Sequence, residues 1–306
     1  MTRSQKTVLL SSLILSAGLI PISIYLIENP YLLDVDTASL PSRNLSLLEQ
    51  QAQVLAGLVI KPIYMMVSLL IIVALLEQRR SAILALQCGQ IAFLTGEVFC
   101  AINFYIYKHE SLLSEYLHSY GMALGFGFTS FALLEGLERL IVSRTSPPST
   151  REPRAILQLL VPVCASLAFI PILSPLQPEA YTTSIFNIPY SYTRLAFYEV
   201  YERRILPVLA LIAFFIAYLS LWRDWEAISF STKVFLCAGL GVLSFSFFRV
   251  ALNAIFVNNL VWFEFWEEAT ELMFVGTIGF CLWRYRAFLL EGTPMLELIN
   301  KSSEAS

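Results

Sequence analysis

The sequence predicts an all-α integral membrane protein with eight transmembrane helices. The chain has 306 residues, of which 57% are hydrophobic and 14% are charged, and its mean hydropathy is +0.67. Soluble domains carry about 25% charged residues, so this composition excludes an ordinary soluble domain. The formal net charge of −3 gives no indication of a basic surface, and we expect no nucleic-acid partner.

Eight apolar runs are long enough to cross a bilayer, which takes about 20 helical residues. The first run is longer than the apolar region of a cleavable signal peptide, so we expect it to form a helix that spans the bilayer. The fourth contains Gly121, Gly125 and Gly127, which are expected to permit close helix packing. The expected spans are residues 7–27, 52–77, 81–107, 116–142, 155–174, 205–222, 232–256 and 260–283.

The positions of the basic residues predict that both termini lie in the cytoplasm. With the N-terminus inside, the cytoplasmic segments and adjoining helix ends hold most lysines and arginines, including Arg79-Arg80, Arg284 and Arg286. This asymmetry follows the positive-inside rule. We therefore expect a multi-pass protein of the cell membrane, with a bacterial inner membrane as the first choice. The outer segments hold Arg43, Lys108, Arg194, Arg203 and Arg204.

The two halves of the chain match weakly but in the same order. Pro62 corresponds to Pro207, Cys88 to Cys237 and Glu115 to Glu264. We interpret this as a tandem duplication of a four-helix unit, with residues 1–150 and 151–290 as two membrane repeats and residues 291–306 as a short cytoplasmic tail. Sites in repeat-built transporters lie at the repeat interface, so we expect the functional site there.

Charged residues within the expected spans indicate a polar site in the outer half of the membrane. At about 1.5 Å per residue, Lys61, Glu97, Arg249 and Glu268 lie at a similar depth below the outer helix ends. Charges at a common depth in a membrane pair with one another or line a pathway. The expected substrate- or ion-binding residues are Lys61, Glu97, Arg249, Asn253, Glu264, Glu267, Glu268 and Glu271.

The leading functional hypothesis is a transporter or ion-coupled permease. Because acids outnumber cations in the set, at least one carboxyl group is expected to be protonated or to hold a cation. Arg249 and Lys61 would bind an anionic or lipid substrate, or would compensate charge. The opposing interpretation is that these residues are structural ion pairs, or that Lys61 snorkels to the surface. No cofactor is predicted, and a bound metal would take its ligands from Glu97, His118, Glu267, Glu268 and Glu271.

Two alternatives from other functional classes stay open. Cys100, His118 and Arg249 would form a thiol catalytic centre in an outward-facing enzyme with a lipid-linked or periplasmic substrate, since a reactive thiol needs a base and a nearby cation. The other alternative is a structural or sensory subunit that contacts a partner through outer loops 28–51 and 174–203. Apolar positions in residues 192–203 lie near helical spacing and predict an interfacial helix.

Overall fold

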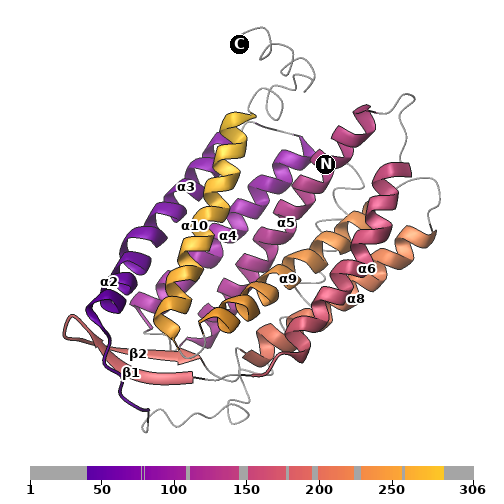
Figure 1. The fold of residues 1–306 in the computed structure, drawn as a ribbon. Helices are drawn as coiled ribbons and strands as arrows, with labels where there is room; N and C mark the ends of the chain where they lie inside the picture. The colour runs from indigo at the N-terminus through magenta and orange to yellow at the C-terminus, as the bar shows by residue number, and fades with distance from the viewer. Residues whose placement is uncertain are drawn as a thin grey trace, which may run out of the picture.

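The protein is described from a computed structural model, which covers residues 40–76, 78, 80–107, 111–144, 151–176, 179–194, 199–223, 229–256 and 259–285. These residues form a bundle of long helices with a two-stranded antiparallel hairpin across one end, here called the hairpin end (Figure 1). The predicted first span, residues 7–27, and the predicted tail, residues 291–306, lie outside the described residues.

Most of the described chain is helical. The helix α2 (Leu47–Leu55) continues through a π-helical turn (Ala56–Ile60) into α3 (Lys61–Ala74), and a second π-helical turn (Tyr201–Ile205) leads into α8 (Leu206–Arg223). The remaining helices are α4 (Ser81–Tyr105), α5 (Leu112–Arg144), α6 (Arg151–Leu173), α9 (Phe230–Ile255) and α10 (Leu260–Arg284). The hairpin consists of β1 (Glu179–Ile185) and β2 (Ile188–Arg194).

The helices fit a membrane protein in both length and apolar character. Within the described residues, five helical segments are long and apolar enough to cross a membrane: Leu47–Ala74, Ser81–Tyr105, Arg154–Leu173, Tyr201–Trp222 and Phe230–Ile255. The predicted spans 116–142 and 260–283 also correspond to helices, α5 with 33 residues and α10 with 25. The count of eight spans and the cytoplasmic position of both termini stay predictions.

The outside of the bundle is apolar. Leu173 is 78% exposed, Trp283 is 74% exposed, and both Leu133 and Leu159 are 70% exposed. In water, a large exposed apolar surface is unfavourable, whereas in a bilayer these side chains would contact lipid tails. The exposed side chains thus agree with the helix lengths in indicating a membrane environment.

Two π-helical turns occupy corresponding places in the two halves of the chain. The first begins at residue 56 and precedes Pro62, and the second begins at residue 201 and precedes Pro207, so both pairs are 145 residues apart (56 to 201 and 62 to 207). Proline has no backbone N–H and crowds the preceding turn, and a π turn widens the helix locally. A tandem repeat predicts such a correspondence, but the division into repeats 1–150 and 151–290 stays a prediction.

The interfacial helix predicted over residues 192–203 is wrong in its first part. The strand β2 runs through Arg194 and pairs with β1, with Tyr181 opposite Tyr192. Both tyrosines are buried, because alternate side chains of a strand point to the same face and here pack on the bundle. The following helix begins earlier than expected, since the π turn at Tyr201–Ile205 is already part of it.

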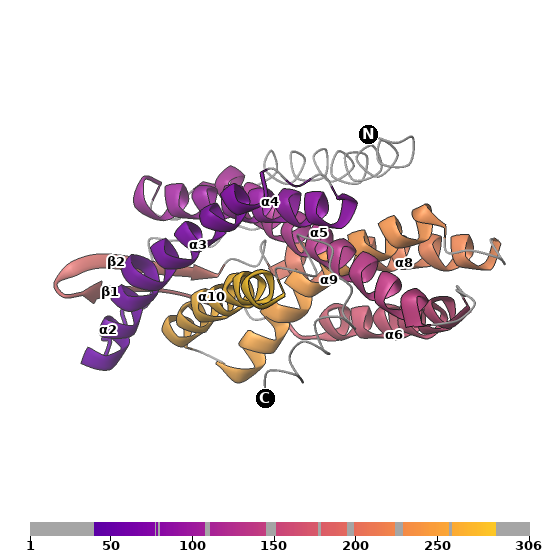
Figure 2. The same cartoon turned by 90° about the horizontal axis from the view of Figure 1, so that it is seen from above.

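The helix α5 packs against both α4 and α9 through glycine. Figure 2 shows α5 and α9 between α2, α3, α4 and α10 on one side and α6 and α8 on the other. A Cβ atom added to Gly121 would overlap the Cα atom of Gly96 on α4, and one added to Gly241 on α9 would overlap the backbone at Gly127. Small residues allow such close contact between membrane helices. The contact of α4 with α5 brings Glu97, beside Gly96, close to His118.

We predict that Gly121→Ala destabilises the protein by about 1–3 kcal/mol, because the new methyl group must push the backbones of α4 and α5 apart. Thermal unfolding of the purified protein in detergent would measure this as a lower midpoint temperature. The matched control is Gly136→Ala on the same helix, where an added Cβ meets nothing within 4 Å. Equal midpoints for the two variants would contradict the glycine contact.

Candidate functional site: a charged cavity

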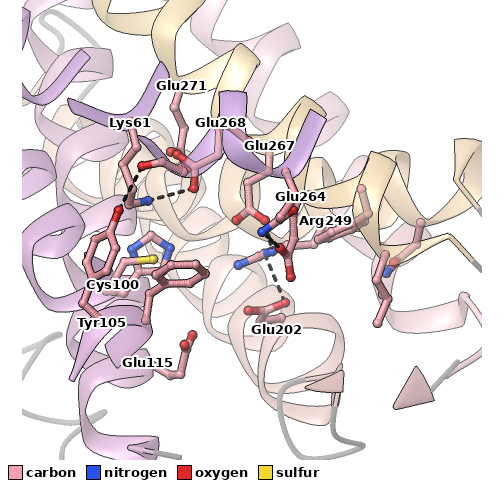
Figure 3. A pocket seen from close by; sticks show the side chains of 18 of the residues that line it. Lys61, Cys100, Tyr105, Glu115, Glu202, Arg249, Glu264, Glu267, Glu268 and Glu271 are labelled. Atoms are coloured by element: carbon pink, nitrogen blue, oxygen red, sulfur yellow. Dashed lines mark hydrogen bonds and ion pairs between the residues drawn. The ribbon is translucent and has the colours of Figure 1, made fainter. Parts of the chain in front are cut away.

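A polar cavity of about 130 Å³ lies between the helices near the hairpin end (Figure 3). Its walls come from α2, the adjoining π turn and the start of α3, from α4, α5, α9 and α10, and from the segment leading into α8. Most of the residues that line the cavity have an ionisable side chain. The charged or titratable residues that line it are Lys61, Cys100, Tyr105, Glu115, His118, Glu199, Glu202, Arg249, Glu264, Glu267, Glu268 and Glu271.

On one side of the cavity, Lys61 joins three helices. Its Nζ atom lies 2.7 Å from Oε2 of Glu97 on α4 and 2.8 Å from Oε1 of Glu268 on α10. The Nζ atom also donates to the Tyr64 hydroxyl, which in turn contacts both carboxylates. The Lys61 side chain is buried and does not snorkel to the surface. One ammonium group and one hydroxyl group therefore serve the carboxylates of the buried Glu97 and the partly buried Glu268.

On the other side, Arg249 of α9 lies between two glutamates (Figure 3). Its Nη1 atom is 2.7 Å from Oε2 of Glu267 on α10, and its Nε atom is 3.4 Å from Oε2 of Glu202. The guanidinium also lies over the rings of Phe245 and Phe263. Glu202 belongs to the second π turn, so Arg249 connects α9, α10 and the start of the α8 helix.

The hairpin and α2 cover the cavity at its end. Leu45, Tyr181, Tyr192 and Leu260 belong to one apolar cluster at that end. Gln53 on α2 donates to the carboxylate of Glu264, which lines the cavity. Burial raises the pKa of Tyr192 above its ordinary value, and the nearby Glu264 carboxylate raises it further, so this hydroxyl stays protonated.

Glu271, His118 and Cys100 also line the cavity. Glu271 is only 4% exposed, and its Oε2 atom makes no hydrogen bond with the described residues. The Nδ1 atom of His118 is 3.4 Å from Oε1 of Glu97. Ligand atoms of Glu97, Cys100 and His118 lie within 4.8 Å of one another, as do those of His118, Glu267 and Glu271. Glu271 and His118 therefore each have a buried polar atom without a hydrogen bond among the described residues, and both lie near further possible ligand atoms.

The cavity has an excess of acidic groups. Its lining holds seven glutamates, whereas Lys61 and Arg249 are the lysine and arginine side chains among the described lining residues. Both cations are already in contact with two carboxylates each. A carboxylate in a low-dielectric site is costly unless it is paired, protonated or bound to a cation. The arrangement thus favours a bound cation or proton over a bound anion.

The structure brings the sequence-predicted site residues together around this cavity. Asn253, Glu264, Glu267, Glu268 and Glu271 line it together with Lys61, Cys100, His118 and Arg249, and Glu97 contacts it through Lys61. Arg249 is paired with Glu202 and Glu267, so the geometry joins Cys100 to His118 and Glu97 instead of to Arg249.

Sequence reasoning missed Tyr64, Glu199 and Glu202. Tyr64 lies one helical turn after Lys61, and that spacing could have identified it. Glu199 and Glu202 were assigned to an outer loop, although their spacing of three residues also fits one helix face. An earlier start of the helix would have placed both beside the cavity, where the structure has them.

We predict that Arg249→Met destabilises the protein by roughly 3–5 kcal/mol, because it leaves the carboxylates of Glu202 and Glu267 without their cation. Denaturant unfolding in detergent would measure the loss. Adding Glu267→Gln to the Arg249→Met variant should recover part of it. Arg43→Met is the control, since the Arg43–Glu49 pair is partly exposed and should be worth less than about 1 kcal/mol. A loss no larger than that of the control would contradict the buried pair.

Comparison of the chain with protein families, with curated proteins and with solved structures finds no match. A function therefore has to be argued from the site, since function resides in the residues of a site and not in the fold. What the structure shows directly is a bundle of apolar helices, fit for a membrane, around a buried cavity rich in carboxylates.

Proposed function

We propose that the protein is a membrane transporter or ion-coupled permease whose cavity binds a cation or a proton. The observation that carries this proposal is the excess of glutamates over lysine and arginine around the cavity. Ionisable residues inside a membrane bundle mark substrate or ion pathways and proton relays. The glutamates in excess of the two cations have to be protonated or bound to a cation, or their charge stays uncompensated.

The pairing pattern identifies the residue that would bind the cation. Lys61 compensates Glu97 and Glu268, and Arg249 compensates Glu202 and Glu267. Glu271 pairs with neither of these two cations among the described residues, and its Oε2 atom, like Oε1 of Glu97, is buried without a hydrogen bond there. A proton or metal cation on Glu271 would remove the energetic cost of an uncompensated buried carboxylate. Uptake or release of that proton or cation would change the charge of the cavity.

The same pattern argues against an anionic substrate. The sequence suggested that Lys61 and Arg249 would bind an anion or compensate charge. In the structure both cations contact carboxylates of the protein itself, so an anion would have to displace those groups. Charge compensation is therefore the role that the geometry favours for both.

The two π turns offer a place for the movement that transport requires. Ala56 and Gly57 of the first turn and Glu202 of the second line the cavity. π-helical turns are frequent at functional sites and interrupt the regular hydrogen-bond ladder. A change of register at either turn would move Lys61 or Glu202 relative to the cavity, which would open one side of a site of the kind found in repeat-built transporters.

We predict that Glu271→Gln reduces cation-induced charge movement by at least about tenfold, because the neutral amide cannot take up a proton or hold a cation. Proteoliposomes on a solid-supported membrane would be exposed to jumps of pH, Na⁺ and Mn²⁺, and the transient current would be recorded. Glu138→Gln is the matched control, because Glu138 pairs with Lys233 outside the cavity lining. Unchanged currents in Glu271→Gln, or none in the wild type, would refute the proposal.

A second candidate is a membrane-embedded thiol enzyme, because the structure places Cys100, His118 and Glu97 together. His118 would take the proton of the Cys100 thiol while Glu97 orients the imidazole. The thiolate would add to an acyl carbon, and the leaving group would depart with the proton from His118. Water would then hydrolyse the thioester and regenerate the thiol.

For this second candidate we predict that Cys100 reacts with iodoacetamide about tenfold faster than an ordinary buried thiol, and that His118→Ala removes the difference. The experiment uses a variant that keeps only Cys100, and a matched variant that keeps only Cys88 on the same helix as control. Alkylation would be followed by mass spectrometry. A Cys100 rate that equals the Cys88 rate, or that is insensitive to His118→Ala, would exclude the thiol mechanism.

A further inference from the structure

We propose that His118, Glu267 and Glu271 form a binding site for a divalent transition-metal ion. A ring nitrogen of His118 and one oxygen from each glutamate lie within 4.8 Å of one another, and all three side chains are buried. Glu267 and Glu271 are one turn apart on α10 and share a face of that helix, while His118 belongs to α5. The inference rests on the proposed function and deepens it by naming the class of cation.

Glu271 gives an independent indication of a ligand. Its carboxyl group is among the most buried of the cavity, at 4% exposed, and its Oε2 atom makes no hydrogen bond with the described residues (Figure 3). The residue lines the cavity, so a ligand bound in the cavity would contact Glu271. A buried carboxylate without a partner costs several kcal/mol, and a metal ion would supply the missing partner.

The donor types select a transition metal over an alkali or alkaline-earth ion. Ca²⁺ and Mg²⁺ prefer sites made of oxygen, whereas imidazole together with carboxylate suits Zn²⁺, Fe²⁺ and Mn²⁺. The Glu97 carboxylate lies 3.4 Å from Nδ1 of His118, and a carboxylate beside one ring nitrogen typically orients a metal-binding histidine. That contact leaves Nε2 for the metal.

Two other groups in the cavity are less suitable. Glu97, Glu268 and Glu271 also bring three oxygens within 4.8 Å, but Lys61 already lies between Glu97 and Glu268. The group of Glu97, Cys100 and His118 uses the same compensated carboxylate. One oxygen of Glu267 accepts a hydrogen bond from Arg249, and the other oxygen remains for a metal ion. Binding of a metal ion by His118, Glu267 and Glu271 would therefore break no ion pair.

The spacing requires only small movements. Zn–N and Zn–O bonds are about 2.0–2.2 Å long, so donors now up to 4.8 Å apart would each have to move by roughly 1 Å or less around an ion. Three protein ligands leave further coordination positions for water in the cavity. An incompletely enclosed ion of this kind exchanges more readily than one in a closed structural site, which suits a transported ion.

The test is Co²⁺ binding to the full-length protein, purified in detergent without a histidine tag and stripped of metal with a chelator. We expect visible absorption bands that saturate at one equivalent of Co²⁺ and disappear when Zn²⁺ is added. Glu271→Gln and His118→Gln should each weaken binding by at least about tenfold, since each removes one of three ligands. Glu138→Gln should bind as the wild type does. Size-exclusion profiles would verify that each variant is folded.

Absence of Co²⁺ binding by the folded wild type would overturn the inference, as would equal binding by Glu271→Gln. These outcomes can be told apart from failure of the proposed function. In one case, Glu271→Gln loses the proton- or Na⁺-induced currents while the wild type binds no Co²⁺. This result would refute the metal site and leave the proposal of a permease for other cations intact. Stoichiometric Co²⁺ binding without any current would support the metal site and refute transport.

Discussion

The ion contacts of Lys61 determine how this bundle is assembled. The Lys61 ammonium lies within 2.8 Å of carboxylates from α4 and α10, so three helices meet at one buried charge. Without that cation, α10 would bring an uncompensated Glu268 carboxylate into an apolar bundle, at a cost of about 3–5 kcal/mol. Arg249 has the equivalent role for α9, α10 and the segment before α8. The position of the acid-rich helix thus depends on two cations that come from other helices.

Close backbone packing makes this electrostatic arrangement geometrically feasible. The overlap that a Cβ atom on Gly121 would make with Gly96 shows how near α4 and α5 approach. That approach brings Glu97 within 3.4 Å of His118, even though Glu97 already contacts Lys61. The glycines therefore connect the ion pair on one side of the cavity to the histidine at its centre. The glycines allow the helices to approach closely, and this approach gives the short distances at which the charged side chains contact one another.

Hydropathy and depth were sufficient to predict most of the long helices among the described residues and the group of residues at the cavity. Lys61, Glu97, Arg249 and Glu268 were placed at one depth by counting residues from the helix ends, and the structure has them around one cavity. Depth could not predict which carboxylates each cation contacts, because it does not say how a helix is rotated about its own axis. The hairpin was also missed, since the loop around Tyr181 and Tyr192 carries aromatic residues that suit either an interfacial helix or a strand.

The two interpretations of the cavity centre compete for one imidazole. His118 lies near the Cys100 thiol and also near the carboxylates of Glu267 and Glu271. A histidine that binds a metal ion has given its lone pair to that ion, so it is unable to accept the thiol proton. Glu97 and Glu271 each have a buried oxygen that makes no hydrogen bond with the described residues. Glu97, on the thiol side of His118, gives its other oxygen to Lys61, whereas Lys61 and Arg249 pair with glutamates other than Glu271. The unmet electrostatic demand of the cavity therefore lies with Glu271, and this favours a cation over a thiolate as the species that the site has to accommodate.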